Sequence, residues 1–128
     1  MSGAMFIRTA SDAADLLAPI FAAAQGERIA VLHLDPGHRM LAVTLEEQGA
    51  ADEAELPVGA IVATALRLGS SAIILAHNHP SGDPSPSEAD LAATRRLAEA
   101  AAAVGIRLFD HLVFAGAECR SFQALGLL

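Results

Sequence analysis

Residues 71–90 decide the fold of this chain, and they read SAIILAHNHPSGDPSPSEAD. The first six of these residues are almost continuously apolar, which is typical of a strand that is buried on both faces. The following HPSGDPS is rich in proline, glycine and serine, and such residues end a strand and form turns. The closing PSEAD combines a serine with acidic residues, as is typical of the first turn of a helix. The stretch therefore predicts a buried strand, a tight loop and a helix.

Capping chemistry marks the beginning of this helix. Ser85 can accept a hydrogen bond from the helix backbone, Pro86 suits the first helical position, and Glu88 can close a capping box with Ser85. We therefore expect Ser85 to be the N-cap. Ser87 and Asp90 then lie three residues apart on one face of the first turns, where an anionic side chain is favoured.

Two histidines and this aspartate could hold a metal ion. Side chains alternate along a strand, so His77 and His79 project to the same side and Asn78 points away. The carboxylate of Asp90 can turn back over the loop toward the histidines. Two imidazole nitrogens and one carboxylate oxygen suit Zn²⁺, and three protein ligands leave a fourth position for water, as in catalytic sites. A histidine pair alone is more often a polar rim, but its combination with the loop, the helix and Asp90 favours a metal site.

The same segment fits a known signature. From His77 to Asp90 the chain matches H-x-H-x7-S-x2-D, the signature of the JAMM metalloprotease superfamily, and the wording HNHPSG and PSEAD resembles the bacterial RadC group within it. Residues 27–35 are similar to the first strand of that family, and residues 105–111 and 121–122 are similar to its later part. Members of the group carry a P-R-E segment where this chain has PVG at residues 57–59, so contacts made by that segment are not expected here.

The resemblance implies a fold and a site. The fold is an α/β (α+β) architecture of the JAB/MPN type, a mixed β-sheet flanked by helices with a deaminase-like core. The site is a metal ion bound by His77, His79 and Asp90. Ser87 hydrogen-bonds near the reacting centre, and a glutamate from an earlier strand is the general base, for which Glu27 is the matching residue. From the residues alone, Glu27 could equally be an exposed charge at a strand start, and Ser87 an ordinary first-turn serine.

The function that follows is a zinc-dependent hydrolase of the JAMM type, which cleaves a peptide or isopeptide bond through a metal-activated water. Glu27 would take the proton of that water, and Ser87 would donate to the developing oxyanion. The competing hypothesis is a non-catalytic MPN-like binding or scaffold module that retains the metal ligands. A zinc deaminase is a weaker third hypothesis, because the chain has neither H-x-E nor P-C-x-x-C.

The remaining sequence predicts helices and strands around this segment. An alanine-rich helix is expected from Ser11 to a point before Gly26, with Pro19 bending or dividing it. Apolar patterns and turn residues predict a hairpin, a helix that Gly69 ends, and a final strand pair. The expected ranges are 28–35 and 39–45 for the hairpin strands, 57–68 and 87–104 for two helices, and 106–114 and 118–121 for the last strands. This order predicts a mixed β-sheet flanked by helices.

Several residues have less specific interpretations. The polar, acidic residues 46–56 are the best loop candidate. His33 is expected to line one face of the sheet, and His38 to face solvent in a turn. Asp110 and His111 could support the metal site from outside its ligands, but a structural hydrogen-bonded pair is the simpler interpretation.

Composition indicates a single domain, residues 1–128, in which 53% hydrophobic residues with no Trp or Tyr predict an aliphatic core. A net charge of −7, with 8 Lys and Arg, opposes nucleic-acid binding, so the expected partner is a protein or peptide substrate. Association into a homo-oligomer stays open. The single Cys119 makes no internal disulfide, no apolar run could span a bilayer, and the first residues are unlike a signal peptide. A cytoplasmic protein with no membrane contact is expected.

Overall fold

The structure is a computed structural model that describes residues 5–23, 26–46 and 56–128. The order of helices and strands along the chain agrees with the order that the sequence predicts. The elements are α1 (Ala10–Ala22), β1 (Ile29–Leu34), β2 (Met40–Glu46), α2 (Val58–Leu68), β3 (Ala72–Asn78), α3 (Glu88–Ala103), β4 (Arg107–Ala115) and β5 (Glu118–Ser121).

The strands form one mixed sheet. Within the described residues its order is β2-β1-β3-β4-β5. β3 and β4 are parallel, and the other neighbouring pairs are antiparallel. Parallel neighbours need a crossover connection, and α3 provides it between β3 and β4. The predicted mixed sheet flanked by helices is confirmed.

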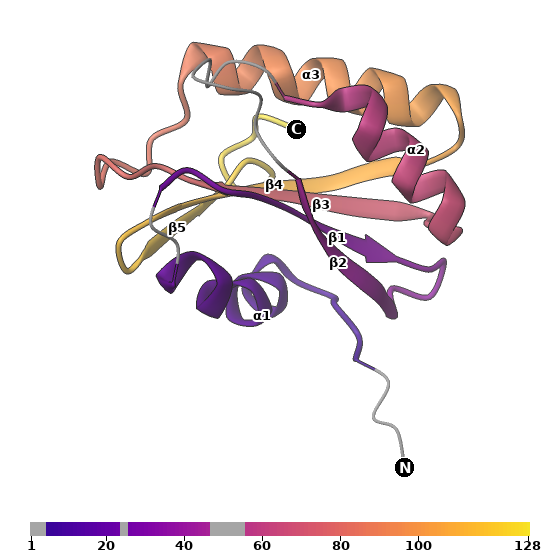
Figure 1. Cartoon of the computed structure of the whole chain (residues 1–128), viewed down its shortest axis with the longest axis horizontal. Coiled ribbons are helices and arrows are strands. Elements are labelled where there is room, and N and C mark those ends of the chain that lie inside the picture. Colours follow the sequence, from indigo (N-terminus) through magenta and orange to yellow (C-terminus); the bar gives the residue numbers. More distant parts are fainter. Residues whose placement is uncertain (1–4, 24–25, 47–55) are drawn as a thin grey trace.

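Helices cover both faces of this sheet, with α2 and α3 on one face and α1 on the other (Figure 1). On the α1 face, Leu17 of the helix packs in one hydrophobic cluster with Leu32 of β1. On the opposite face, Ile61 of α2 and Leu97 of α3 pack in a second cluster with Val31 of β1. The central strands are therefore buried on both sides, which explains why their sequences are continuously apolar.

The first helix begins earlier than the sequence predicts. Thr9 is its N-cap, because Thr9 Oγ1 accepts a hydrogen bond from the Asp12 N–H at 3.0 Å and Asp12 Oδ2 accepts one from the Thr9 N–H at 3.2 Å. The expectation that Ser11 opens the helix is therefore wrong. The helix ends at Ala22, and Pro19 lies inside it without dividing it.

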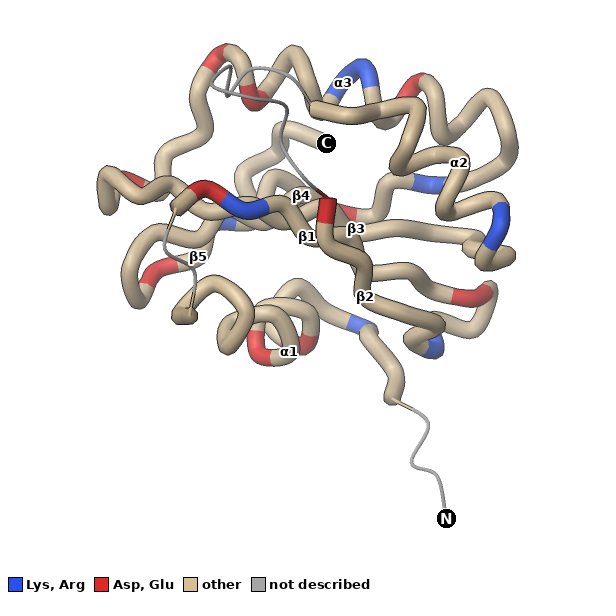
Figure 2. The backbone as a smooth tube through the Cα atoms, viewed as in Figure 1, with Lys and Arg blue, Asp and Glu red and all other residues tan. Residues whose placement is uncertain are grey.

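Charged residues of both signs are spread over the described surface (Figure 2). On α3 the exposed pair Arg95 and Arg96 lies between the acidic Glu88 and Glu99. The predicted acidic loop falls almost entirely on residues 47–55, which lie outside the described residues. Among the described helices, none has the length and apolar character needed to cross a membrane.

Candidate metal centre

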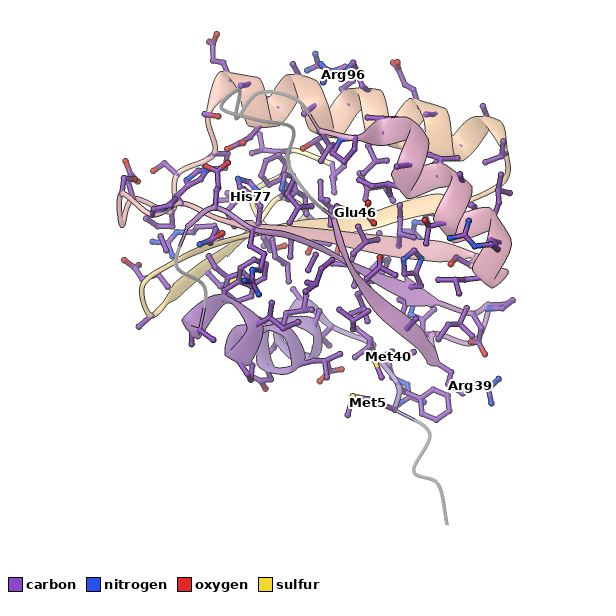
Figure 3. The ribbon with its side chains drawn as sticks, in the orientation of Figure 1. Met5, Arg39, Met40, Glu46, His77 and Arg96 are labelled. Carbon is purple, nitrogen blue, oxygen red and sulfur yellow. The ribbon has the colours of Figure 1, made fainter. Side chains whose placement is uncertain are left out.

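The two histidines lie where β3 leaves the sheet. His77 pairs with Ile29 at the beginning of β1, so it is at the opposite end of the sheet from Arg39 and the β1–β2 turn (Figure 3). His79 follows directly after the strand, and its N–H donates to the carbonyl oxygen of Phe114 at 2.8 Å. This backbone bond keeps His79 beside β4. The local strand geometry therefore sets the spacing between the two imidazoles.

Asn78, between the histidines, anchors the segment that precedes β1. Its Oδ1 accepts a hydrogen bond from the Arg28 N–H at 2.7 Å, and its Nδ2 donates to the carbonyl oxygen of Gly26 at 3.0 Å. Glu27 lies between these two anchored residues and is partly buried. Asn78 therefore couples the position of Glu27 to the strand that carries His77.

A capping box at the start of α3 delivers the aspartate. Ser87 is the N-cap: its Oγ accepts from the Asp90 N–H at 3.0 Å, and Asp90 Oδ2 accepts from the Ser87 N–H at 2.9 Å. The expectation that Ser85 and Glu88 form this box is wrong. The Ser85 N–H donates instead to Asp83 Oδ1 at 3.0 Å, which keeps Ser85 in the loop, and Asp90 closes the box because it follows Ser87 by three residues.

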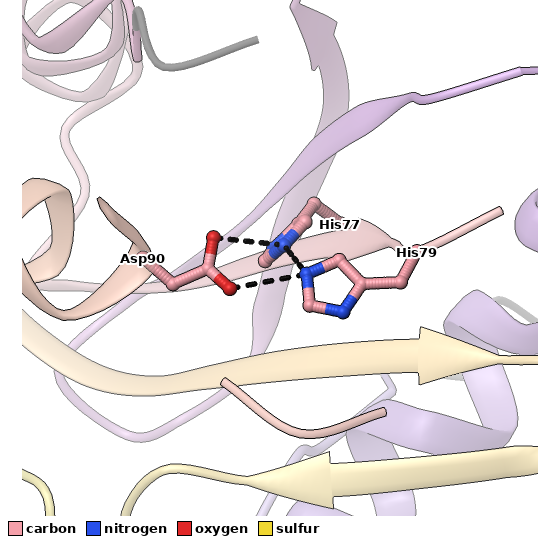
Figure 4. Close-up of side chains that lie close together, drawn as sticks. All are labelled: His77, His79 and Asp90. Atoms are coloured by element: carbon pink, nitrogen blue, oxygen red, sulfur yellow. Dashed lines mark hydrogen bonds and ion pairs between the residues drawn. The ribbon is translucent and has the colours of Figure 1, made fainter. Parts of the chain in front are cut away.

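The three predicted ligands converge (Figure 4). His77 Nε2 lies 2.9 Å from His79 Nε2 and 3.3 Å from Asp90 Oδ1, and His79 Nε2 lies 3.0 Å from Asp90 Oδ2. One ligand atom from each residue lies within 4.8 Å of the other two, so the three residues could hold a metal ion. The structure thus brings together the side chains that the sequence predicts to meet, while their metal binding stays a prediction.

The contacts of His79 show which of its ring atoms would face a cation. Its Nδ1 lies 2.8 Å from the carbonyl oxygen of Asp83, which can only accept, so Nδ1 carries the proton. In the neutral ring Nε2 is then an acceptor, and it faces His77 Nε2 and Asp90 Oδ2. Acceptor atoms this close repel one another unless a proton or a metal ion lies between them. The chemistry of the donor set therefore fits a cation.

Zinc suits these donors in chemistry and in size. Imidazole nitrogen and carboxylate oxygen bind zinc at about 2.0 to 2.2 Å, in tetrahedral geometry. Two nitrogens on one such ion lie about 3.3 Å apart. The two Nε2 atoms are 2.9 Å apart, so a small opening of the side chains of His77 and His79 would admit the ion.

Asp90 is held in its ionised form. Burial alone would raise the pKa of this partly buried carboxyl, but the adjacent His77 ring and the hydrogen bond from the Ser87 N–H outweigh burial and hold its pKa well below the usual range. The beginning of α3 also favours a negative charge at this position. Asp90 therefore presents a carboxylate rather than a carboxylic acid at neutral pH.

Two buried residues lie on the other side of the His77 ring. His111 Nε2 is 2.8 Å from His77 Nδ1, and Thr94 Oγ1 is 2.6 Å from His111 Nδ1. Phe122 stacks on the His111 ring, with 4.3 Å between the ring centroids. Burial disfavours the charged form and holds the pKa of His111 well below 6.5, so its ring is neutral near pH 7.

The sequence predicts only part of this arrangement. The backbone N–H of His111 donates to Asp110 Oδ1 at 2.7 Å, and the Ser121 hydroxyl donates to Asp110 Oδ2 at 2.6 Å. Asp110 thus holds the final segment of the chain, while the His111 side chain contacts the site. Thr94 lies four residues after Asp90 on one helix face, a spacing in the sequence that could have found it.

His77, His79 and Asp90 line a cavity of about 510 Å³, a size typical of sites that bind small molecules. Glu27 and Ser87 line the same cavity, so both predicted catalytic residues reach it, and their roles stay predictions. Apolar side chains contribute to its walls, among them Ile29, Leu56 and Leu75. The cavity therefore places apolar side chains next to a large group of polar ones.

Comparison with known proteins places the chain in a family. The family model of the RadC-like JAB domain matches residues 7–127. Proteins named UPF0758 are 44% identical over 102 residues in Rhodobacter capsulatus and in Bordetella avium, and 41% identical over 104 residues in Coxiella burnetii. These matches cover 80%, 80% and 81% of this chain, but only 48%, 45% and 46% of the relatives. The chain thus spans about half the length of the curated relatives it matches. With the mixed sheet and the site described above, the match shows that the chain belongs to the family of RadC-like JAB domains.

Proposed function

We propose that this domain is a zinc-dependent hydrolase of the JAMM type, acting on a peptide or isopeptide bond. The observation that carries the proposal is the convergence of His77, His79 and Asp90, whose nitrogen and oxygen atoms lie close enough for one metal ion to bridge them. The cavity beside them supports it, because Glu27 and Ser87 line that cavity as well. Three protein ligands on a tetrahedral ion leave one position for solvent, as catalytic sites require.

Zinc bound here would lower the pKa of a coordinated water to about 7 and would polarise a carbonyl oxygen. Glu27 would act as general base: its carboxylate takes a proton from the attacking water and later passes it to the leaving amine. The Asn78 side chain keeps the two neighbours of Glu27 in place through its bonds to Gly26 and Arg28. A fixed base is effective because the cost of orienting it is met during folding.

Ser87 would supply a hydrogen-bond donor. Its Oγ accepts from the Asp90 N–H, which leaves the hydroxyl hydrogen able to point into the cavity. A donor aimed at the oxyanion that develops on the substrate carbonyl is worth about 3 to 4 kcal/mol by comparison with other oxyanion holes. One serine would thus cap α3 and stabilise the transition state.

Cysteine chemistry is a poor alternative for this domain. Burial raises the pKa of the Cys119 thiol to about 11, so the thiol is protonated at neutral pH. A protonated thiol is neither the nucleophile nor the metal ligand that a cysteine enzyme needs. Hydrolysis through an activated water therefore fits the described residues better.

The decisive experiment compares zinc-loaded protein with its Glu27→Gln variant on a panel of linear and isopeptide-linked substrates. We expect cleavage to be lost in the variant while its zinc content stays at that of the unchanged chain, because Gln cannot accept the proton. Glu99→Gln, an exposed change on α3, is the matched control and should cleave normally. Cleavage by Glu27→Gln at the unchanged rate would contradict the mechanism, and a zinc-loaded chain that binds peptides without cleaving any would favour a binding module.

A further inference from the structure

A chain of three short contacts runs from His77 to the backbone of Asp90. His77 Nδ1 lies 2.8 Å from His111 Nε2, His111 Nδ1 lies 2.6 Å from Thr94 Oγ1, and Thr94 Oγ1 lies 2.6 Å from the carbonyl oxygen of Asp90. Thr94 and His111 are each 2% exposed, so water does not compete for these bonds. The chain of contacts therefore begins at one predicted ligand and ends at the backbone of another.

The last contact sets the direction of all the others. A carbonyl oxygen only accepts, so the single hydroxyl hydrogen of Thr94 is donated to Asp90. Thr94 Oγ1 must then accept from His111 Nδ1, which places the one proton of the neutral His111 ring on Nδ1. His111 Nε2 is left as an acceptor, and it accepts a hydrogen bond from the N–H at His77 Nδ1.

The opposite direction is disfavoured by the same atoms. It would require the Thr94 hydroxyl to donate to His111, and Thr94 Oγ1 would then face the Asp90 carbonyl oxygen at 2.6 Å with no hydrogen between them. Two acceptors at that distance in a buried place repel strongly. The Phe122 ring stacks on the His111 ring, which opposes a rotation of His111 that would relieve the conflict.

We propose that Thr94 and His111 are positioning residues that hold His77 in its Nδ1–H tautomer. In that tautomer the lone pair of His77 Nε2 points to His79 and Asp90, where a metal ion would bind. The Asp83 carbonyl does the same for His79, so with both rings neutral the two Nε2 lone pairs point to the same place, and the rings must move slightly apart until a metal ion lies between them. The inference rests on the proposed metal site for its purpose, but the tautomer itself is a property of the metal-free chain.

We call the hydrogen bonds from His77 through His111 and Thr94 to the Asp90 carbonyl the relay. The relay is tested by ¹⁵N NMR of histidine-labelled, metal-free protein at a pH where the rings are neutral. We expect His77 to carry its proton on Nδ1 in the unchanged chain and in Thr94→Ser, which keeps the hydroxyl. Thr94→Val keeps the shape of the side chain but removes the hydroxyl, so both tautomers of His77 should appear. Thr64→Val, on α2, is a matched substitution remote from the cavity and should change nothing.

A second readout is the affinity for zinc, measured by titration against a competing chelator. Loss of a group that orients a metal-binding histidine typically weakens metal affinity by about 10- to 100-fold, so we expect that loss in Thr94→Val and its recovery in Thr94→Ser. A proton on His77 Nε2 in the unchanged chain would overturn the relay even if zinc binds. A Thr94→Val variant that keeps both the Nδ1–H tautomer of His77 and the zinc affinity of the unchanged chain would also overturn the relay. A change in its melting temperature alone would not support the relay.

The NMR readout separates this inference from the proposed function. If the unchanged chain binds no zinc but shows His77 with its proton on Nδ1, the proposed function fails and the relay stands. If zinc binds and Glu27→Gln abolishes cleavage, while His77 is protonated on Nε2 in the metal-free chain, the relay fails and the proposed function stands.

Discussion

At the scale of single residues, His33 shows how a buried imidazole can be satisfied without any metal. It lies in β1 with no exposed surface, and it is held between two hydroxyls. Its Nδ1 lies 2.9 Å from Ser70 Oγ, and its Nε2 lies 3.0 Å from Thr44 Oγ1. Burial lowers the pKa of His33 from 6.5 to about 4. The folded chain therefore keeps this ring neutral far below the pH at which the unfolded chain protonates it.

This shift predicts a loss of stability in acid. Between pH 6.5 and about 4 the unfolded state binds a proton at His33 that the folded state refuses, so stability falls as the pH is lowered through that window. The contribution of His33 to the free energy of unfolding is fully present above pH 6.5, and it amounts to at most about 3 kcal/mol. The free energy of unfolding can be measured by urea unfolding of metal-free protein at several pH values. It should depend less steeply on pH in His33→Gln than in the unchanged chain. Identical slopes for the two proteins would contradict this account.

The residues of the metal cluster were predictable from sequence to different degrees. His77 and His79 could be placed together because alternation along a strand is local, and Asp90 because helix geometry is local. The contact between Thr94 and His111 could not be predicted, because it joins α3 to β4 and depends on how the helix packs on the sheet. The contact of Asp110 with Ser121 likewise depends on the pairing of β4 with β5.

At the scale of elements, the start of α3 joins helix stability to the site. Ser87 caps the helix and Ser85 does not. We expect Ser87→Ala to lower the free energy of unfolding by about 1 kcal/mol, and Ser87→Gly by only a few tenths. Ser85→Ala should leave it unchanged. Chemical denaturation of the three variants checks this, and an equal loss for Ser85→Ala would mean that the capping box is placed wrongly.

Two glycines, one inside α2 and one directly after it, give opposite predictions. Gly69 ends the helix with a φ of 74°, in the left-handed region, so Gly69→Ala should cost about 1 to 2 kcal/mol. Gly59 lies inside the helix, and a Cβ built there meets no atom within 4 Å. Gly59→Ala should therefore stabilise the protein by about 0.5 to 1 kcal/mol. Thermal unfolding of both variants distinguishes these effects, and shifts of the same sign would be inconsistent with this geometry.

Strands were easier to predict than helix ends. Uninterrupted apolar residues identify the buried strands β1 and β3, because helices cover both faces of the sheet. A cap depends on which side chain reaches which N–H, and both serine predictions failed at this level of detail. Asp12 follows Thr9 by three residues, and Asp90 follows Ser87 by three residues, so an aspartate at the third helical position selected each cap.

At the scale of the whole molecule, the candidate metal centre joins parts that are distant in sequence. His77 and His79 belong to the end of β3, and Asp90 to the start of α3, on the face of the sheet that α2 and α3 cover (Figure 1). A cation held by all three can bind only the folded chain, so it should stabilise the fold by mass action. At a free zinc concentration 100 times the dissociation constant, the gain is about 2.7 kcal/mol.

This coupling predicts a melting temperature that rises with zinc. The rise should be absent in His79→Ala, because this variant lacks one of the three predicted ligands. The His79 side chain lies outside the two hydrophobic clusters, so its removal leaves both clusters intact. It should persist in His38→Ala, because His38 lies in the β1–β2 turn at the opposite end of β1 from the residues that face His77. Differential scanning fluorimetry with and without zinc compares the three proteins. Equal shifts in all three would show that zinc acts elsewhere on the chain.

The most direct measurement is the zinc stoichiometry of the metal-free chain, obtained by calorimetric titration alongside His77→Ala, His79→Ala and Asp90→Asn. We predict that the unchanged chain binds one zinc ion and that each variant loses most of its affinity, while circular dichroism shows that the variants remain folded. An unchanged chain that binds no zinc, or folded variants that bind it as tightly as the unchanged chain does, would contradict the claim that these three side chains form a metal centre.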